Sequence, residues 1–252
     1  MNDKAQVTTF IVMGLLLLVF VALFATLIAD KNIQTLSVDI LPDDSAPLQT
    51  YVTSCLDSVT EEALVFIGLH GGYFVVPSDA HEKIKVPYYI DGDVKKVPSI
   101  EVVEEQLQLY IQVGMYVCLD NFESFKKEGY TIEEGAPLVD VDLLPRKVLV
   151  SAQVPLMLQN GEKSIQLEKS TVEVPSRLFS IHAKILGLTA SDRLDGDSFC
   201  LTCFFWLMED FKVEMMEMGD QTTLVSIIDE EVLINGEPYT YHFLYKIKER
   251  EV

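Results

Sequence analysis

The feature that most constrains this chain is the uncharged apolar segment Phe10–Ala29. No charged residue occurs between Lys4 and Asp30, and Leu, Val, Ile and Phe dominate the segment. A helix of this length rises about 30 Å, which matches the hydrocarbon thickness of a bilayer. In lipid, a helix is the only single segment that satisfies all its own backbone hydrogen bonds. The sequence therefore predicts an N-terminal membrane anchor over residues 1–29, whose partner is the lipid bilayer through residues 10–29.

The charge of the chain lies almost entirely beyond this segment. The 252 residues carry 19 Lys and Arg against 39 Asp and Glu, a formal net charge of −20, and only Asp3 and Lys4 precede the segment. An acidic domain repels nucleic acid and anionic lipid headgroups. We therefore expect no nucleic-acid partner. Lys4 and the terminal amine precede the segment, while Asp30 and Lys31 cancel after it. This favours an N-terminus inside and a large domain outside the cell membrane.

Beyond the anchor, hydrophobic periodicity divides the chain into elements. Residues 30–47 contain prolines and acids without periodicity and are predicted to be a linker. Apolar residues spaced by three and four predict helices over 48–70, 99–127 and 176–188. Period-two patterns and turn residues predict strands over 73–77, 87–90, 93–97, 138–143, 148–152, 154–158, 164–174, 213–218, 222–228 and 239–247. The aromatic-rich stretch 198–208 is either a buried helix or a buried strand.

These elements predict an α+β fold. Local hairpins separated by single helices imply an antiparallel or mixed sheet with three or four helices packed on it. The expected organisation is a transmembrane helix followed by an extracytoplasmic domain over 48–252. Lobes over 48–130 and 136–252 are possible. The absence of a linker-like stretch between them favours one continuous unit.

Cys55 and Cys118 are candidates for a disulfide bond. Each lies on the apolar face of a predicted helix, and the two helices are expected to pack on the same sheet. Outside the cell such a pair would be oxidised. Closing a loop of this length would stabilise the domain by about 4 kcal/mol. The alternative is two buried thiols that act as small hydrophobic residues.

Cys200 and Cys203 form a C-x-x-C pair, which allows three interpretations. In redox enzymes such a pair is exposed at a helix N-terminus, which lowers the thiol pKa. Here the neighbours are Phe199, Phe204 and further aromatic residues, which favour burial. A local disulfide or a cross-bridge is the second interpretation, and buried thiols are the third. The sequence offers no second C-x-x-C or close histidine pair for a zinc site.

The remaining polar residues form no recognisable catalytic constellation. The four histidines are scattered without metal-ligand spacing and are expected to be structural. Asp192, Asp195 and Asp197 surround Gly196, but the spacing is not that of an EF-hand. No G-x-S-x-G elbow, P-loop or dinucleotide fingerprint occurs. We therefore expect no enzyme activity, no cofactor and no metal.

The residues before the anchor resemble a known leader junction. Lys4-Ala5-Gln6 runs through Val7-Thr8-Thr9 into the apolar helix and resembles the N-terminus of archaeal pilin-like proteins. The resemblance covers about the first thirty residues and implies cleavage between Ala5 and Gln6, after which the helix can pack in a filament core. Ala5 stands where that family usually has Gly, and Phe10 where it typically has Glu. The alternative is a permanent, uncleaved anchor.

The domain itself resembles uncharacterised, singly anchored archaeal surface proteins. The likeness rests on the order of elements and on local strings such as Tyr51-Val52-x-x-Cys55-Leu56, and it implies no activity. We expect a structural or adhesive surface protein whose partners are itself or other envelope proteins. One alternative is a ligand- or cation-binding subunit of a membrane complex. Another is a membrane-tethered thiol oxidoreductase that uses Cys200 and Cys203.

Overall fold

A computed structural model describes residues 46–127, 131–160, 163–167, 169–190 and 200–248. The predicted anchor, the leader junction and most of the linker lie outside these residues. Within the described part of the chain, no helix is both long enough and apolar enough to cross a membrane. The described residues from Pro47 onward form one compact unit.

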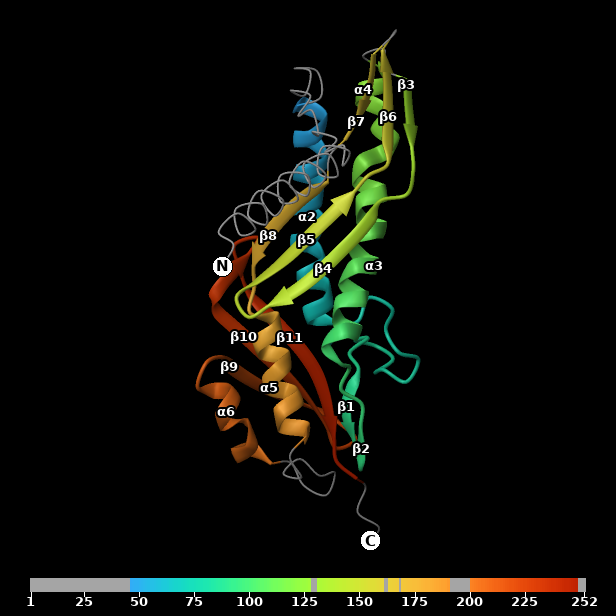
Figure 1. Ribbon diagram of the computed structural model, residues 1–252. Helices are drawn as coiled ribbons and strands as arrows, with labels where there is room; N and C mark the ends of the chain where they lie inside the picture. The colour runs from blue at the N-terminus through green and yellow to red at the C-terminus, as the bar shows by residue number, and fades with distance from the viewer. Residues whose placement is uncertain (1–45, 128–130, 161–162, 168, 191–199, 249–252) are drawn as a thin grey trace, which may run out of the picture. The chain divides into compact units, whose positions relative to one another are not determined.

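This unit is an α+β structure with one mixed sheet and two antiparallel sheets (Figure 1). The helical elements are α2 (Ala46–Leu69), α3 (Ile100–Leu119), η1 (Asp120–Phe122), α4 (Glu123–Lys127), α5 (Leu178–Ala190), η2 (Leu201–Phe204) and α6 (Phe205–Met208). The strands are β1 (Tyr88–Asp91), β2 (Val94–Lys95), β3 (Thr131–Glu134), β4 (Leu138–Leu144), β5 (Lys147–Gln153), β6 (Leu156–Asn160), β7 (Lys163–Gln166), β8 (Ser170–Pro175), β9 (Lys212–Gly219), β10 (Thr222–Ile234) and β11 (Glu237–Lys246).

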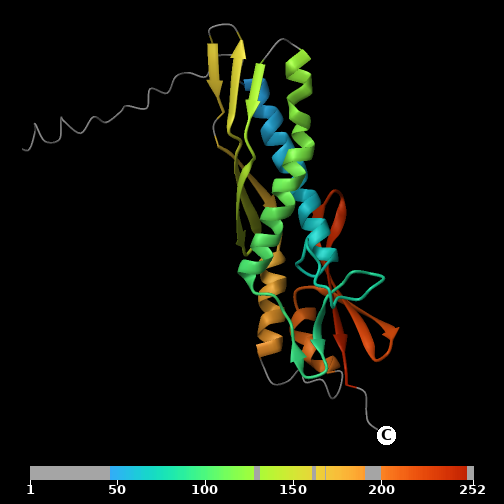
Figure 2. The same cartoon turned by 90° about the vertical axis from the view of Figure 1, so that its right-hand side faces the viewer.

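Helices α2 and α3 lie side by side and run in opposite directions (Figures 1 and 2). Most residues of their predicted apolar faces are buried: Leu48, Val52, Cys55, Leu56, Val59, Ala63 and Ile67 in α2, and Val103, Leu107, Ile111 and Met115 in α3. The predicted members Phe66, Ile100 and Cys118 are only partly buried, and Leu119, which was not predicted, is buried. The predicted N-cap of α3 is also confirmed, since the Val102 amide donates to Ser99 Oγ over 3.4 Å.

The predicted continuous helix over 99–127 is wrong at its C-terminal end. Asp120 has a φ of 44°, in the left-handed region, and its amide bonds to the Val117 carbonyl. Aspartate tolerates this conformation because its short side chain can hydrogen-bond locally. The chain therefore leaves α3 there and continues through η1 into the separate helix α4.

The sheet β4-β5-β8 lies against α2 and α3 (Figure 1). It is antiparallel, with Val141 opposite Val150 and Val150 opposite Val172, and alternate residues of each strand are buried. Polar contacts also join sheet and helices, because the Leu143 amide donates to Glu104 Oε1 over 2.9 Å. The predicted period-two strands of this region are thus confirmed.

The predicted hairpin around Asn160 is confirmed, but its second strand is shorter than expected. β6 pairs with β7, with Leu158 opposite Ile165, in the sheet β3-β6-β7. The stretch 164–174 is not one strand, because β7 ends at Gln166 and β8 joins a different sheet. The intervening Leu167 is 6% exposed, so the chain crosses between the two sheets with this side chain buried.

The third sheet is mixed, in the order β2-β1-β11-β10-β9. β1 runs parallel to β11, and the other neighbours are antiparallel. The predicted turn at Asn235-Gly236 is confirmed: both residues have positive φ, of 53° and 82°, as a tight two-residue hairpin requires. Helix α5 packs beside this sheet (Figure 1), and its predicted inward residues Leu178, Ile181, Ile185 and Leu188 are buried.

Two further expectations are decided by the structure. The predicted strand over 73–77 is absent from this described stretch, because Gln106 Oε1 accepts the amides of Phe74 and Val75 over 3.0 and 2.8 Å. A side-chain amide thus replaces the neighbouring strand that these donors would need. The ambiguous stretch 198–208 is helical over its described residues, as η2 followed by α6.

Helix α2 ends on the mixed sheet at a position that requires glycine. A Cβ on Gly68 would lie 2.4 Å from the Thr240 carbonyl oxygen and 2.9 Å from the Tyr239 hydroxyl. The missing side chain lets the helix approach β11 closely. Buried residues from α2, α3 and the sheets belong to one main hydrophobic cluster.

Candidate functional site

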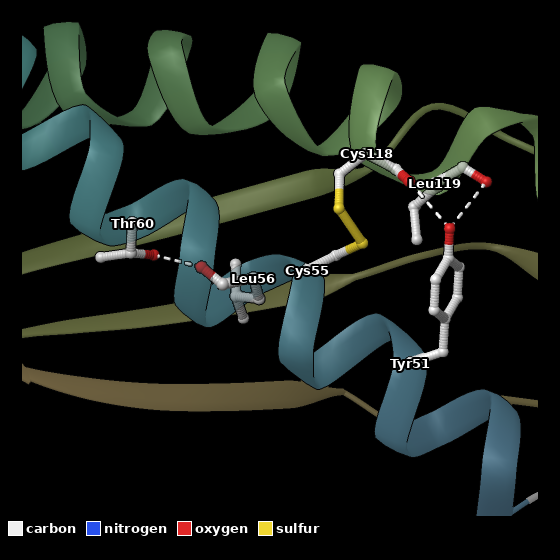
Figure 3. The surroundings of a disulfide bond; sticks show 6 residues. All are labelled: Tyr51, Cys55, Leu56, Thr60, Cys118 and Leu119. Atoms are coloured by element: carbon white, nitrogen blue, oxygen red, sulfur yellow. Dashed lines mark hydrogen bonds between the residues drawn. A yellow bond between two sulfur atoms is a disulfide. The ribbon is translucent and has the colours of Figure 1, made fainter. Parts of the chain in front are cut away.

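The disulfide Cys55–Cys118 joins α2 to α3 (Figure 3). The two Cα atoms are 5.9 Å apart, and Cys55 is 3% exposed. Both cysteines come from the facing sides of antiparallel helices, so the packing of the two apolar faces brings the sulfur atoms together. The predicted disulfide is confirmed.

Tyr51 holds the end of α3 beside this disulfide. Its hydroxyl donates to the Cys118 carbonyl over 2.8 Å and lies 3.5 Å from the Leu119 carbonyl (Figure 3). These carbonyls belong to the last turn of α3, where no later helical amide can reach them. The Tyr51 ring also packs against Phe122 and Phe125, with ring centroids 6.2 and 5.6 Å apart. The helix end is thus fixed covalently and by hydrogen bonding.

Cys200 and Cys203 form the second disulfide, so all four cysteines are paired. The pair begins η2, and both cysteines are partly exposed. The expected burial among aromatic residues is wrong for the side chains that follow, since Phe205 is 58% and Trp206 46% exposed. Phe204 points into the core instead, because the tight 3-10 turn separates its direction from that of its neighbours.

A second apolar face of α3 is exposed to solvent. It consists of Leu109, Val113, Tyr116 and Val117, which are 37%, 48%, 63% and 70% exposed. The positions i, i+4, i+7 and i+8 place them on one stripe of the helix. No charged residue occurs between Glu105 and Asp120, although 23% of the chain is charged. This stripe, called here the α3 apolar face, is an uncharged and partly exposed side of the helix.

A groove of about 580 Å³ runs between α2 and the α3 apolar face. Val113, Val117 and Cys118 line it from α3, while Ser58, Val59, Glu62 and Phe66 line it from α2. Of the described residues that line it, Glu62 alone is charged. The groove is therefore apolar along its length and acidic at its edge.

One end of the groove is an aromatic cluster. Phe66, Phe74 and Tyr110 pack with ring centroids 5.1–5.9 Å apart, in tilted and edge-on geometries. The loop that carries Phe74 is held by the two hydrogen bonds to Gln106. Burial, and then the nearby Glu62 carboxylate, raise the pKa of Tyr110, so its hydroxyl stays neutral. The cluster is a preorganised apolar surface.

The buried histidine is structural. His182 is fully buried, and its Nε2–H donates to the Pro98 carbonyl over 2.8 Å. Its Nδ1 therefore accepts from the Tyr241 hydroxyl over 3.2 Å, and that hydroxyl lies 2.5 Å from the Tyr89 hydroxyl. Burial lowers the pKa of His182, which is consequently neutral. These contacts connect α5, β1 and β11, as expected for a histidine without a catalytic partner.

A buried ion pair fixes the start of α5 on β10. Arg177 Nε donates to Asp229 Oδ2 over 2.8 Å, and a second guanidinium nitrogen bonds to Oδ1. Asp229 is fully buried, while Arg177 also stacks over the Phe211 ring at 4.6 Å and pairs with Glu231. The hydrogen bond to Asp229 raises the pKa of Arg177. This arrangement joins two elements and exposes no reactive group.

The described residues contain no cluster of three or more side chains suited to a metal ion. Asp192, Asp195 and Asp197 lie outside those residues, as do Ala5 and Gln6. No protein-family model, curated protein or solved structure matches this chain. The groove between α2 and α3 is consequently the best-defined candidate for a functional surface.

The groove was missed by the sequence analysis. Helical periodicity identified the buried face of α3, but no role was predicted for its other side. The available signal was the charge distribution: a solvated helix of an acidic domain should carry charges throughout, yet residues 106–119 carry none.

Proposed function

We propose that this protein is a singly anchored cell-surface protein that presents its α+β domain outside the membrane, as a structural or adhesive part of a surface assembly. The observation that carries this proposal is the pairing of all four cysteines in disulfides. Disulfides persist in oxidising compartments and are rare in the cytosol. The uncharged segment Phe10–Ala29 supplies the membrane attachment.

The proposal of assembly is supported by the α3 apolar face. Soluble domains rarely expose contiguous apolar surface unless it contacts a partner. The partners would be copies of this protein or other envelope proteins. The pilin-like junction adds a finer proposal: cleavage between Ala5 and Gln6 would free the apolar segment to pack within a filament.

Protease treatment of intact cells tests the location. Cells that produce the full chain with an epitope tag after Val252 are exposed to added protease, and the tag is followed by immunoblotting. Loss of the tag from intact cells is expected, and a cytosolic tagged protein is the control. A tag that is digested only after cell lysis would refute the proposal. N-terminal sequencing of the purified protein then distinguishes a mature Gln6 end from an intact Met1 end.

A membrane-tethered thiol oxidoreductase is the second candidate function, favoured by the partial exposure of Cys200 and Cys203 in the structure. The reaction would transfer the disulfide to a substrate dithiol. A substrate thiolate attacks one sulfur and forms a mixed disulfide as the Cys200–Cys203 bond breaks. The second substrate thiolate then attacks the mixed disulfide, which closes the substrate disulfide and leaves Cys200 and Cys203 as thiols that carry the two substrate protons. Incubation of the full chain with a reduced dithiol peptide tests it. Rapid oxidation of the peptide, lost in Cys200→Ser/Cys203→Ser, would support this function. Oxidation no faster than with that variant would exclude it.

A further inference from the structure

The two helices that border the groove carry charge of one sign only. α2 contains Asp57, Glu61 and Glu62, α3 contains Glu101, Glu104 and Glu105, and neither contains a lysine or arginine. Of these acids, Glu104 is used internally by the Leu143 amide. Among the rest, Glu62 lines the groove, while Asp57 lines a separate hollow beside Val172 and Glu173 of β8. The groove is therefore acidic at Glu62, and neither bordering helix carries a basic residue that could neutralise it.

We propose that the groove between α2 and α3 binds an amphipathic helix of a partner protein, with an apolar face flanked by lysine or arginine. Naming this partner class rests on the proposed function, a surface protein that works in an assembly. An apolar helix face fits a hydrophobic groove through residues spaced by three, four and seven. A basic residue at the edge of that helix would face Glu62, and the net charge of −20 would steer a basic partner towards the domain.

The length of the groove sets the length of the helix. The α3 apolar face extends from Leu109 to Val117, which corresponds to about 12 Å along the helix axis, and the aromatic cluster extends it. About two to three turns of a partner helix would cover this surface. Phe66, Phe74 and Tyr110 are already packed before binding, so little side-chain entropy would be lost there.

A second copy of this chain fits the groove less well. Its own α2 and α3 carry acids and no lysine or arginine that could pair with Glu62, and like charges across an interface oppose association. Lys126 and Lys127 lie in α4, beyond the end of α3 and past the further acids Asp120 and Glu123. A basic partner helix meets no such repulsion.

The disulfide is part of this arrangement. Cys118 lines the groove, and its bond to Cys55 fixes the separation of the two helices at this point (Figure 3). The bond therefore opposes closure of the groove and sliding of the helices at this end of it.

Peptide binding to the full chain tests the proposal. The chain is placed in nanodiscs of zwitterionic lipid, and the probe is a fluorescent helical peptide of about three turns with leucines at i, i+3, i+4 and i+7 flanked by lysines. A matched peptide carries glutamate in place of every lysine. Fluorescence anisotropy should show binding of the lysine peptide only, with affinity that falls as salt is raised.

Variants of the chain separate the groove from the lipid. Val117→Lys should weaken lysine-peptide binding at least about tenfold, and Glu62→Gln about two- to fivefold. Leu233→Lys and Glu237→Gln on the β10–β11 hairpin are exposed controls and should bind as the wild type does. Near-ultraviolet circular dichroism confirms that each variant is folded.

Three results would overturn the inference: equal binding of the two peptides, equal affinity of wild type and Val117→Lys, or dimerisation of the chain through Val113 and Val117. Each leaves the surface location intact if the protease experiment succeeds. Conversely, peptide binding by a chain that is not surface-exposed would refute the proposed function and retain the groove.

Discussion

Removal of the Cys55–Cys118 disulfide is expected to destabilise the domain more than removal of Cys200–Cys203. The cysteines of the first pair are separated by 63 positions and those of the second by 3. Loop-closure entropy grows with the logarithm of loop length, which gives about 4 kcal/mol for the first and about 2 kcal/mol for the second. In a domain of roughly 200 residues, 1 kcal/mol corresponds to about 2–4 °C in melting temperature. The expected losses are therefore about 8–16 °C and about 4–8 °C.

The comparison uses two double variants of the full chain in detergent micelles, Cys55→Ala/Cys118→Ala and Cys200→Ala/Cys203→Ala. Melting is followed by near-ultraviolet circular dichroism, which reports the packing of the buried tyrosines. Because Cys55 is buried, its truncation adds a small packing loss in the same direction. Equal shifts for the two variants, or a larger shift for the second, would refute the loop-length reasoning.

Three further predictions concern the buried polar contacts and the approach of α2 to the sheet. Arg177→Met leaves the Asp229 carboxylate buried without its ion-pair partner and should lower the free energy of urea unfolding by about 3–5 kcal/mol. The double variant Arg177→Met/Asp229→Leu should recover most of this loss. A double variant as unstable as the single one would contradict the reasoning. Burial lowers the folded-state pKa of His182 below its unfolded value near 6.5, so its stabilisation is complete above about pH 6.5 and is lost as pH falls below it. The drop in urea midpoint from pH 7.5 to pH 5.5 should be smaller in His182→Gln than in the wild type. A smaller drop should remain because burial also lowers the pKa of His242. A drop equal to that of the wild type would contradict the role given to His182. Gly68→Ala places a Cβ against the Thr240 carbonyl and should destabilise the domain by about 2 kcal/mol. Gly219 has open space around it but a positive φ, so Gly219→Ala measures the cost of backbone conformation alone.

Helix faces and hairpin turns were predictable because each depends on residues near one another in sequence. The spacing of Leu48, Val52 and Cys55 identifies a buried face, and Asn235-Gly236 has the backbone freedom that a tight turn needs. The pairing of Cys55 with Cys118 follows once both lie on inward faces of neighbouring helices.

The errors arose where a distant residue decided the local structure. Gln106, thirty-one positions away from Val75, satisfies the loop amides that were assigned to a strand. Where α3 ends before Asp120, the Tyr51 hydroxyl of α2 donates to the Cys118 carbonyl. Neither partner can be recognised from the local pattern. The groove is a further case, since it exists only where an uncharged side of α3 meets α2.

The position of the Cys55–Cys118 bond also determines how the domain bears mechanical load. A force transmitted from the predicted anchor enters the domain at the start of α2. Within α2, the residues that precede Cys55 are Ala46–Ser54. Once those residues are pulled free, the tension passes through a covalent bond to the far end of α3. The loop enclosed by the bond, which includes most of α2 and α3, cannot be extended from that side. A tethered protein built this way would lose one short stretch of helix under tension and keep its groove.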